Sequence, residues 1–334
     1  MYVIENKNTT PQFNLALEEC LCVRAMKDGS KFFMLWQNEP SIIVGRFQNT
    51  LEEINSDFVR ERGIHLVRRN SGGGAVYHDL GNINYSFIVP DSDALSNPSA
   101  GGLDFSFFTE PIIKALAALG AKAEPTGRND LSIEEKKISG GAQFRRGGVT
   151  LHHGTLLYDS DLDVLSQALQ PSEDKFQSKA VKSVRSRVCN IKPYLSESVS
   201  VNEFQKRLAH GIEGLTPMAL DSVILNEAER LAHEKYSAWE WNYGESPRFT
   251  ERKKMRFSWG GIEALLLVDE GKIADCKFYG DYFGSGNYAS LLSRLAGVSY
   301  TKESISKKLA ESENELSEIF AGSNLDDIVT LLAP

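Results

Sequence analysis

The first half of the chain alternates short apolar runs with turns that contain glycine, a pattern typical of β-strands. Two predicted helices interrupt it. The first carries Leu51, Ile54 and Phe58 on one face and ends near Gly63, and the second spans residues 107–119. The predicted strands are 32–36, 42–45, 65–68, 75–77 and 84–89, with more between residues 131 and 158.

The second half begins with helical patterns and ends in a differently patterned region. Ser200 and Glu203 have the spacing of a capping box, which predicts a helix that ends near Gly211. Further on we predict a hairpin around Glu270-Gly271. The other predictions are helices over 162–169 and 222–236, a polar linker over 241–254, hairpin strands 262–268 and 273–279, and three short C-terminal helices.

These elements predict an α+β protein with two domains. The pattern lacks regular βαβ alternation, so we expect a mixed or antiparallel sheet in residues 1–245 and a small α/β domain in residues 255–334.

Composition narrows the class of protein. Hydrophobic residues make up 41% and charged residues 25% of the 334 residues, as in globular enzymes. The net charge of −8 argues against a general nucleic-acid binder. No long apolar run or leader pattern is present, so we expect a cytoplasmic protein without a membrane segment. The four cysteines are too few and too scattered for a disulfide framework or a zinc ribbon.

The most informative stretch is residues 68–79, RRNSGGGAVYHD. Three glycines let the backbone approach a ligand and direct its N–H groups at an anion, beside the charges of Arg68 and Arg69. Glycines alone are equally typical of a flexible turn with solvated arginines. The nearby Ser71, His78 and Asp79 favour a binding site for phosphate or carboxylate.

A second stretch carries Lys137 before a glycine pair and Asp130 just upstream. A lysine can lie between two anions that must meet, and an aspartate is a ligand that Mg²⁺ accepts together with phosphate oxygens. Each alone is more often a solvated turn or a helix cap.

A basic run over 175–187, which includes Arg185, could bind a nucleotide, attract an acidic partner or be a solvated face. His152 and His153 are neighbours on a predicted strand, so only one of them can face a given site.

These motifs together resemble the two-domain bacterial lipoate–protein ligase A family. The resemblance covers almost the whole chain, including the N-terminal FNLALEEC and the region from Phe257 onward. The motifs that carry it, in order, are RRNSGGGAVYHDLGN (68–82), GRND (127–130), KISGGA (137–142), HHGTLL (152–157) and SVRSRVCN (183–190).

The resemblance implies a catalytic domain of the biotin/lipoate ligase fold, an accessory domain that rotates between two half-reactions, and the use of ATP and Mg²⁺. Lipoate would attack the α-phosphate of ATP to give lipoyl-AMP and pyrophosphate. A lysine of a lipoyl domain, in the E2 subunits of 2-oxoacid dehydrogenases or in the glycine cleavage H protein, would then accept the lipoyl group.

The same resemblance assigns site residues by motif position. Lys137 would be catalytic and would touch both substrates, and Asp130 would lie near Mg²⁺. Those that would bind ATP are Arg69, Gly74, Ala75, Val76, Tyr77, Asn129, Lys137 and Arg185, and those that would bind lipoate are Trp36, Arg69, Gly73, His78 and Lys137. Tyr77 would also bring a hydroxyl near the nucleotide.

Three rival functions remain to be compared. An octanoyltransferase of the same fold would need no ATP and would use a cysteine nucleophile, for which Cys189, after Arg185 and Arg187, is the candidate. Retention of Lys137 and of a C-terminal domain argues against it. A non-catalytic lipoate-binding module would have no need of Lys137 or Asp130, and biotin–protein ligases differ around the glycine turn.

Overall fold

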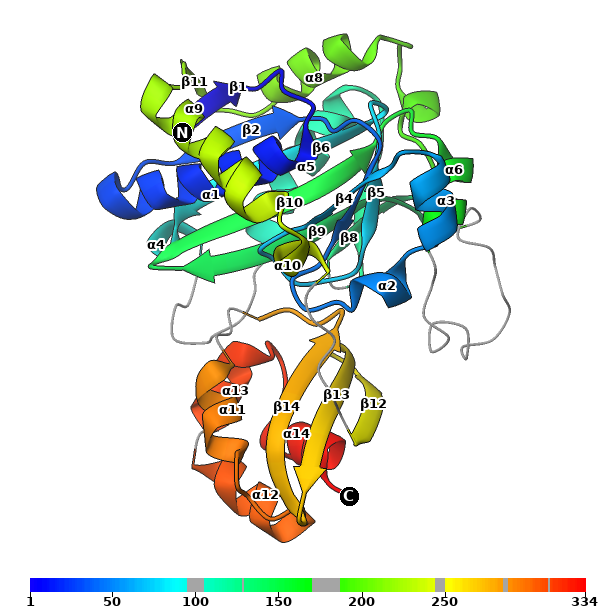
Figure 1. Ribbon diagram of the computed structural model, residues 1–334. Helices are drawn as coiled ribbons and strands as arrows, with labels where there is room; N and C mark the ends of the chain where they lie inside the picture. Colours follow the sequence, from blue (N-terminus) through cyan, green and yellow to red (C-terminus); the bar gives the residue numbers. More distant parts are fainter. Residues whose placement is uncertain (95–104, 128, 170–186, 244–249, 285–287, 312) are drawn as a thin grey trace.

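The computed structural model describes residues 1–334 except 95–104, 128, 170–186, 244–249, 285–287 and 312. A large N-terminal unit and a smaller C-terminal unit are each built on a sheet (Figure 1). The eight-stranded sheet has the order β11 (Thr216–Met218), β1 (Tyr2–Glu5), β2 (Phe32–Trp36), β6 (Asn82–Pro90), β10 (Val149–Leu157), β9 (Lys136–Arg146), β8 (Asp130–Ile133) and β7 (Glu124–Thr126).

This sheet is mixed, as predicted. Strand β1 pairs in parallel with β11 and β2, and the pairs from β2 through β6, β10, β9 and β8 to β7 are antiparallel. A second sheet of three short strands has the order β4 (His65–Arg68), β3 (Ser41–Val44) and β5 (Val76–His78).

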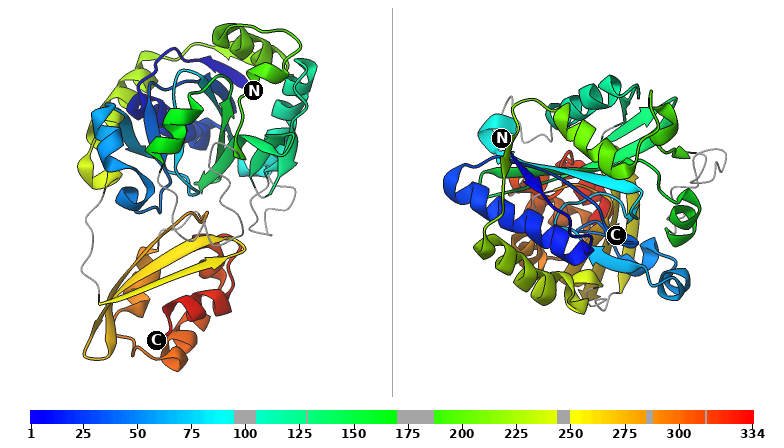
Figure 2. Two further views of the ribbon diagram at one scale, coloured as in Figure 1. Left: turned by 90° about the vertical axis from the view of Figure 1, so that its right-hand side faces the viewer. Right: turned by 90° about the horizontal axis from the view of Figure 1, so that it is seen from above.

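Helices cover both faces of the large sheet because successive side chains of a strand point to opposite faces. On β2, Phe32, Met34 and Trp36 pack with helices α1 (Pro11–Asp28) and α9 (Ser222–Leu231). Phe33 points the other way, towards α5 (Ser106–Ala118) and α8 (Val201–His210). Figure 2 (right) shows the two groups of helices on opposite sides of the strands.

The predicted helix that starts near Leu51 is instead two short helices, α2 (Thr50–Glu53) and α3 (Ser56–Glu61). Ile54 between them is extended and forms an isolated antiparallel bridge with Leu169, which follows α6 (Leu162–Ala168). A tertiary contact therefore overrides the helical periodicity. The remaining short helices of this unit are α4 (Asp91–Ala94), η3 (Lys192–Tyr194), the π-helical turn η4 (Ala232–Tyr236) that continues α9, and α10 (Trp239–Asn242).

Ser200 caps α8 by accepting a hydrogen bond from the Glu203 backbone N–H, and α8 ends at His210, before Gly211, as predicted. Among the described helices, none is long and apolar enough to cross a membrane.

The C-terminal unit is a three-stranded antiparallel sheet with helices packed against it. The predicted hairpin is confirmed, and its turn residues Glu270 and Gly271 have φ of 47° and 72°. Among the described residues, four helices follow rather than the three predicted. The elements are β12 (Glu251–Phe257), β13 (Gly260–Asp269), β14 (Lys272–Gly280), α11 (Ala289–Leu295), α12 (Lys302–Ala310), α13 (Glu313–Ile319) and α14 (Leu325–Leu332).

The predicted linker over 241–254 is too long at both ends. Trp241 and Asn242 belong to α10 and bind the N-terminal unit, because the Arg68 side chain donates to both of their carbonyl oxygens. Residues 251–254 form part of β12, so that strand starts four residues before the predicted domain start at residue 255.

The two units meet where the end of β14 lies against the glycine turn. The rings of Phe47 and Tyr282 stack with centroids 4.6 Å apart, and the Gly280 N–H donates to the Phe47 carbonyl oxygen at 2.6 Å. The Gly73 N–H donates to the Tyr282 carbonyl oxygen at 3.1 Å. The C-terminal unit therefore touches the motif that the sequence analysis selected.

Candidate functional site

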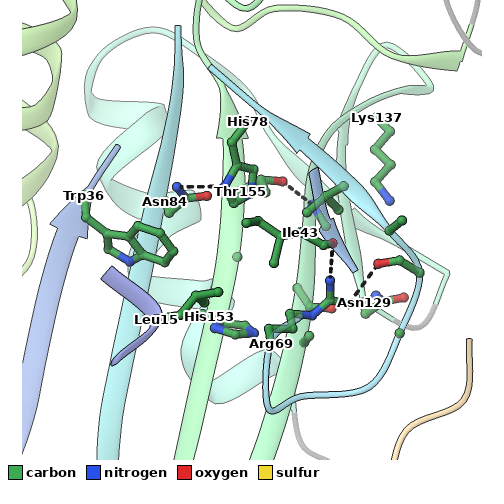
Figure 3. A pocket seen from close by; sticks show the side chains of 18 residues that line it. Leu15, Trp36, Ile43, Arg69, His78, Asn84, Asn129, Lys137, His153 and Thr155 are labelled. Carbon is green, nitrogen blue, oxygen red and sulfur yellow. Dashed lines mark hydrogen bonds between the residues drawn. The ribbon is translucent and has the colours of Figure 1, made fainter. Parts of the chain in front are cut away.

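A pocket opens between the large sheet and the small sheet and offers about 590 Å³ of space, part of it open to solvent. Figure 3 shows its walls. The lining residues are Leu15, Trp36, Ile43, Arg69, Gly73, Gly74, Ala75, Val76, His78, Asn84, Asn129, Lys137, Gly140, Gly141, Ala142, His153, Gly154 and Thr155.

The glycine turn forms one wall, and Arg69 fixes its shape. The guanidinium of Arg69 donates to the carbonyl oxygens of Ile43, Gly72 and Gly74 at 3.0, 2.6 and 2.8 Å and to Ser71 Oγ at 2.9 Å. Burial of this group lowers its pKa to about 10, so it is still charged at pH 7. Arg69 therefore places positive charge beside the turn while most of its hydrogens are already engaged.

Gly73 is required by the shape of this turn. Its φ of 88° favours glycine, and a Cβ there would lie 3.0 Å from the Phe283 ring and 3.1 Å from the Arg69 guanidinium. Gly45 approaches the same turn so closely that a Cβ on it would lie 1.9 Å from the Gly73 carbonyl oxygen. The backbone can adopt this arrangement only without side chains at these positions.

Arg68 does not face the pocket, which corrects the expectation of two arginine charges beside the ligand. Its buried guanidinium donates to the carbonyl oxygens of Gly45, Gln48 and Trp241 at 2.8 to 2.9 Å, and to Thr50 Oγ1 at 2.6 Å. The arginine thus connects α2, the loop that follows β3, and α10, and has a structural role.

Lys137 lies on the opposite wall and pairs with Asp130 of the adjacent strand, which itself does not line the pocket. The ammonium Nζ lies 2.8 Å from Asp130 Oδ1, and both side chains are about one-third exposed, at 39% and 32%. Gly140 makes room for this pair, because a Cβ there would lie 2.9 Å from Lys137 Nζ. Asn129 is held beside them: its Nδ2 donates to the Gly141 carbonyl oxygen at 2.7 Å, and its own carbonyl accepts from the Gly141 N–H at 2.7 Å.

A buried chain of hydrogen bonds runs beneath the pocket. Trp36 Nε1 donates to Ser86 Oγ at 2.7 Å, and Ser86 donates to the Glu18 carboxylate at 2.6 Å. Glu18 also accepts from His153 Nδ1 at 3.0 Å, and His153 Nε2 pairs with Ser71 Oγ at 2.6 Å. These hydrogen bonds link α1 and the large sheet to the glycine turn and fix the relative positions of the pocket walls.

Only one of the two neighbouring histidines faces the pocket, as the strand alternation predicts. His153 lines the pocket, whereas His152 stacks on Phe108 with ring centroids 4.6 Å apart, on the other side of the sheet. Burial lowers the pKa of His152 well below its usual value, so it is a neutral core residue.

Three other candidates do not line the pocket. The Tyr77 side chain is buried in a different apolar cluster and does not line the pocket, so the structure does not support a hydroxyl at a nucleotide in this pocket. Asp79 accepts hydrogen bonds from the backbone N–H groups of Gly81, Asn82 and Asp161 and fixes a turn. Cys189 contacts the Lys136 carbonyl oxygen, and burial raises the pKa of its thiol, the opposite of an activated nucleophile.

The pocket thus brings together most of the residues selected from the sequence. Arg185 lies outside the described residues. Those selected that line the pocket are Trp36, Arg69, Gly73, Gly74, Ala75, Val76, His78, Asn129 and Lys137. The sequence analysis assigned no binding role to the other lining residues. It named the glycine pair after Lys137 and His153 as features of their motifs, and it did not single out Leu15, Ile43 or Asn84.

Family models define the class of protein. Residues 10–213 match the lipoyl protein ligase A/B catalytic domain, and residues 246–332 match the bacterial lipoate protein ligase C-terminus. The chain belongs to the family of two-domain lipoate–protein ligases. It is similar to the lipoate-protein ligase LplJ of Bacillus subtilis, with 41% identity over 99% of this chain and 100% of that protein.

Solved structures agree with this assignment. The P. falciparum LipL1 in complex with lipoate has a TM-score of 0.77 and 25% identity over 98% of both chains. A lipoate-protein ligase A bound with ATP has a TM-score of 0.63 and 29% identity over 73% of this chain and 98% of that chain. A bipartite lipoate protein ligase of Thermoplasma acidophilum, described with its E2 lipoyl domain, has a TM-score of 0.64 and 32% identity over 74% and 97%.

Proposed function

We propose that this enzyme activates lipoate with ATP and transfers the lipoyl group to a lysine of an acceptor protein. The observation that carries the proposal is that Lys137 and the glycine turn, which are more than sixty positions apart in sequence, line the same pocket. Trp36, Ile43 and Leu15 line the pocket and would contact the apolar chain of the acid, and cationic and amide groups at the mouth would bind a nucleotide.

The lining residues support a division of the pocket into two parts. The lipoyl group would occupy the part lined by Trp36, Arg69, Gly73 and His78, with its carboxylate at Lys137. The nucleotide would lie along Gly74, Ala75, Val76 and the backbone of Tyr77, near Asn129 and Lys137.

The chemistry follows from the charges. A carboxylate and a triphosphate repel each other, so their approach needs a cation between them. In our proposal the Lys137 ammonium leaves Asp130 to bind both the carboxylate and the α-phosphate. A carboxylate oxygen attacks the phosphorus, the bond to the bridging oxygen breaks, and pyrophosphate leaves. Negative charge that builds on the phosphate oxygens is stabilised by Lys137 and the N–H groups of the turn.

Asp130 would hold Mg²⁺. Among the described residues no group of three or more His, Cys, Asp or Glu side chains could hold a metal. A single carboxylate nevertheless suits Mg²⁺, which binds proteins through one or two carboxylates and otherwise takes phosphate oxygens and water. When bound, the ion would neutralise part of the charge of the leaving pyrophosphate.

The second half-reaction needs access for the acceptor lysine, whose amine attacks the acyl carbon of lipoyl-AMP and displaces AMP. The Gly73 N–H is engaged by the Tyr282 carbonyl oxygen, so a substrate group that uses this N–H must displace the C-terminal unit. We therefore propose two domains, residues 1–245 and residues 255–334, and we extend the second domain to the start of β12. The contact between these two domains would change between the half-reactions.

The acceptors we propose are E2 lipoyl domains and the glycine cleavage H protein, in the cytoplasm.

An acceptor panel tests the proposal. The enzyme is incubated with ATP, Mg²⁺ and either lipoate or octanoate, together with a purified E2 lipoyl domain or H protein, and acylation is measured by mass spectrometry. We expect lipoylation that requires ATP and releases AMP and pyrophosphate. Acylation without ATP, from an octanoyl carrier protein, would instead support the transferase.

A further inference from the structure

His78 lies at the end of β5 and lines the pocket near Trp36, with ring centroids 6.0 Å apart. Its side chain is buried, with 3% exposure for the residue. Figure 3 shows His78, Asn84 and Trp36 towards one side of the pocket and Lys137 with Asn129 towards the other. His78 therefore belongs to the part of the pocket remote from the proposed reaction centre.

Side-chain amides fix which nitrogen of His78 carries the proton. Asn38 Nδ2 lies 3.0 Å from His78 Nδ1, and the orientation of this amide is set because Asn38 Oδ1 accepts from Asn14 Nδ2 at 2.8 Å. Asn84 Nδ2 approaches the same nitrogen at 3.4 Å, while Asn84 Oδ1 accepts from Asn82 Nδ2. Both neighbours thus present donors, so Nδ1 must accept and Nε2 must carry the hydrogen.

This hydrogen has no acceptor among the described residues. Ten buried side-chain nitrogen or oxygen atoms of the described residues have no hydrogen-bond partner, and of these only His78 Nε2 belongs to a residue that lines the pocket. Burial and the nearby Arg69 charge lower the pKa of His78 to about 3, so the ring is neutral. A buried donor without a partner is costly, and this cost is removed only by a ligand that offers an acceptor.

We propose that the Nε2–H of His78 donates to a sulfur atom of the bound lipoyl ring and so selects a sulfur-bearing acid over a plain alkyl acid. The inference rests on the proposed function, in which the carboxylate is engaged at Lys137 on the other side of the pocket. The two ring sulfurs are then the remaining acceptors of lipoate, and sulfur is a weak acceptor. Octanoate has none there, so it leaves the donor unpaired, and a site built to hydrogen-bond a substrate discriminates against an analogue that lacks the partner.

The test compares kcat/KM for lipoate and octanoate in pyrophosphate release by the full-length enzyme. We expect His78→Leu to reduce the lipoate-to-octanoate ratio about tenfold, because an unpaired donor no longer penalises octanoate. His78→Gln keeps an N–H donor and is expected to retain most of the ratio. Ser41→Ala is the matched control: Ser41 pairs with His78 across the β3–β5 ladder, has a buried unpartnered hydroxyl and does not line the pocket.

Equal losses for both acids in His78→Leu would overturn the proposal and leave His78 a packing residue. If His78→Leu does not fold, ¹⁵N NMR of the wild-type enzyme decides. We expect a neutral His78 protonated at Nε2, whose Nε2–H resonance shifts with lipoate but not with octanoate. The same shift with both acids would contradict the proposal. Absence of pyrophosphate release by the wild-type enzyme with either acid would instead refute the proposed function.

Discussion

Lys137 Nζ lies 2.8 Å from Asp130 Oδ1 across the β8–β9 ladder, at the mouth of a pocket whose opposite wall is the glycine turn. The pair keeps the ammonium at the mouth before an anionic substrate arrives. Gly140 leaves the space in which the lysine side chain lies. Once Lys137 binds the substrates, Asp130 would be free to hold a metal ion.

The first prediction concerns this carboxylate. We expect Asp130→Asn to raise the Mg²⁺ concentration for half-maximal pyrophosphate release by at least about tenfold, because an amide is a weaker ligand. A Mg²⁺ titration measures it, with Glu135→Gln, an exposed change on the same hairpin, as control. Identical titrations for Asp130→Asn and the wild type would remove Asp130 from the metal site.

The second prediction separates two adjacent glycines. Gly73→Ala should destabilise the protein by about 1–3 kcal/mol, because of its positive φ and the close approach of Phe283 and Arg69. Gly74→Ala has no atom within 4 Å of the added Cβ, and we expect a change within about 0.5 kcal/mol. Urea unfolding measures both, and equal destabilisation by the two substitutions would contradict the geometry of the turn.

The third prediction is a pH dependence of stability. In the unfolded chain a histidine binds a proton below pH of about 6.5, whereas burial lowers the pKa of His152 far below that value in the fold. Stability from this group is therefore complete above pH 6.5 and is lost as the pH falls, at about 1.4 kcal/mol per pH unit. Urea unfolding between pH 7 and 5 should show a slope shallower by that amount in His152→Gln, and equal slopes would refute the assignment.

The fourth prediction concerns the rival function. Cys189 donates its backbone N–H to the Lys137 carbonyl oxygen, and its thiol lies outside the pocket lining. Cys189→Ala should therefore retain ATP-dependent lipoylation within about twofold, as expected of a substitution away from the chemistry. A loss of several orders of magnitude would revive the transferase mechanism.

Local signals account for what the sequence predicted of the fold. Strand 32–36 and the hairpin at Glu270-Gly271 have the predicted places because alternation and turn chemistry act over a few residues. Strand β1 was missed because Tyr2 pairs with Thr216, far along the chain. The break at Ile54 depends on Leu169 in the same way.

The site divides along similar lines. Glycines and a lysine are typical of an anion-binding site, so the sequence motifs predict that Gly73 and Lys137 belong to one. The contact of Glu18 with His153 spans 135 positions and has no local signal. Local chemistry does not distinguish Arg68 from Arg69. In the folded protein the Arg68 side chain points into the N-terminal unit, whereas Arg69 points towards the pocket.

The most direct test of the central claim is lipoate-dependent exchange of labelled pyrophosphate into ATP, measured without acceptor protein in the wild type, Lys137→Ala and Lys136→Ala. Lys136 is an exposed neighbour of Lys137 on the same strand. We predict exchange that requires lipoate, falls by roughly 10²–10³ or more in Lys137→Ala and is retained in Lys136→Ala. Exchange at the wild-type rate in a folded Lys137→Ala protein would contradict the claim that Lys137 and the glycine turn join the acid to the nucleotide.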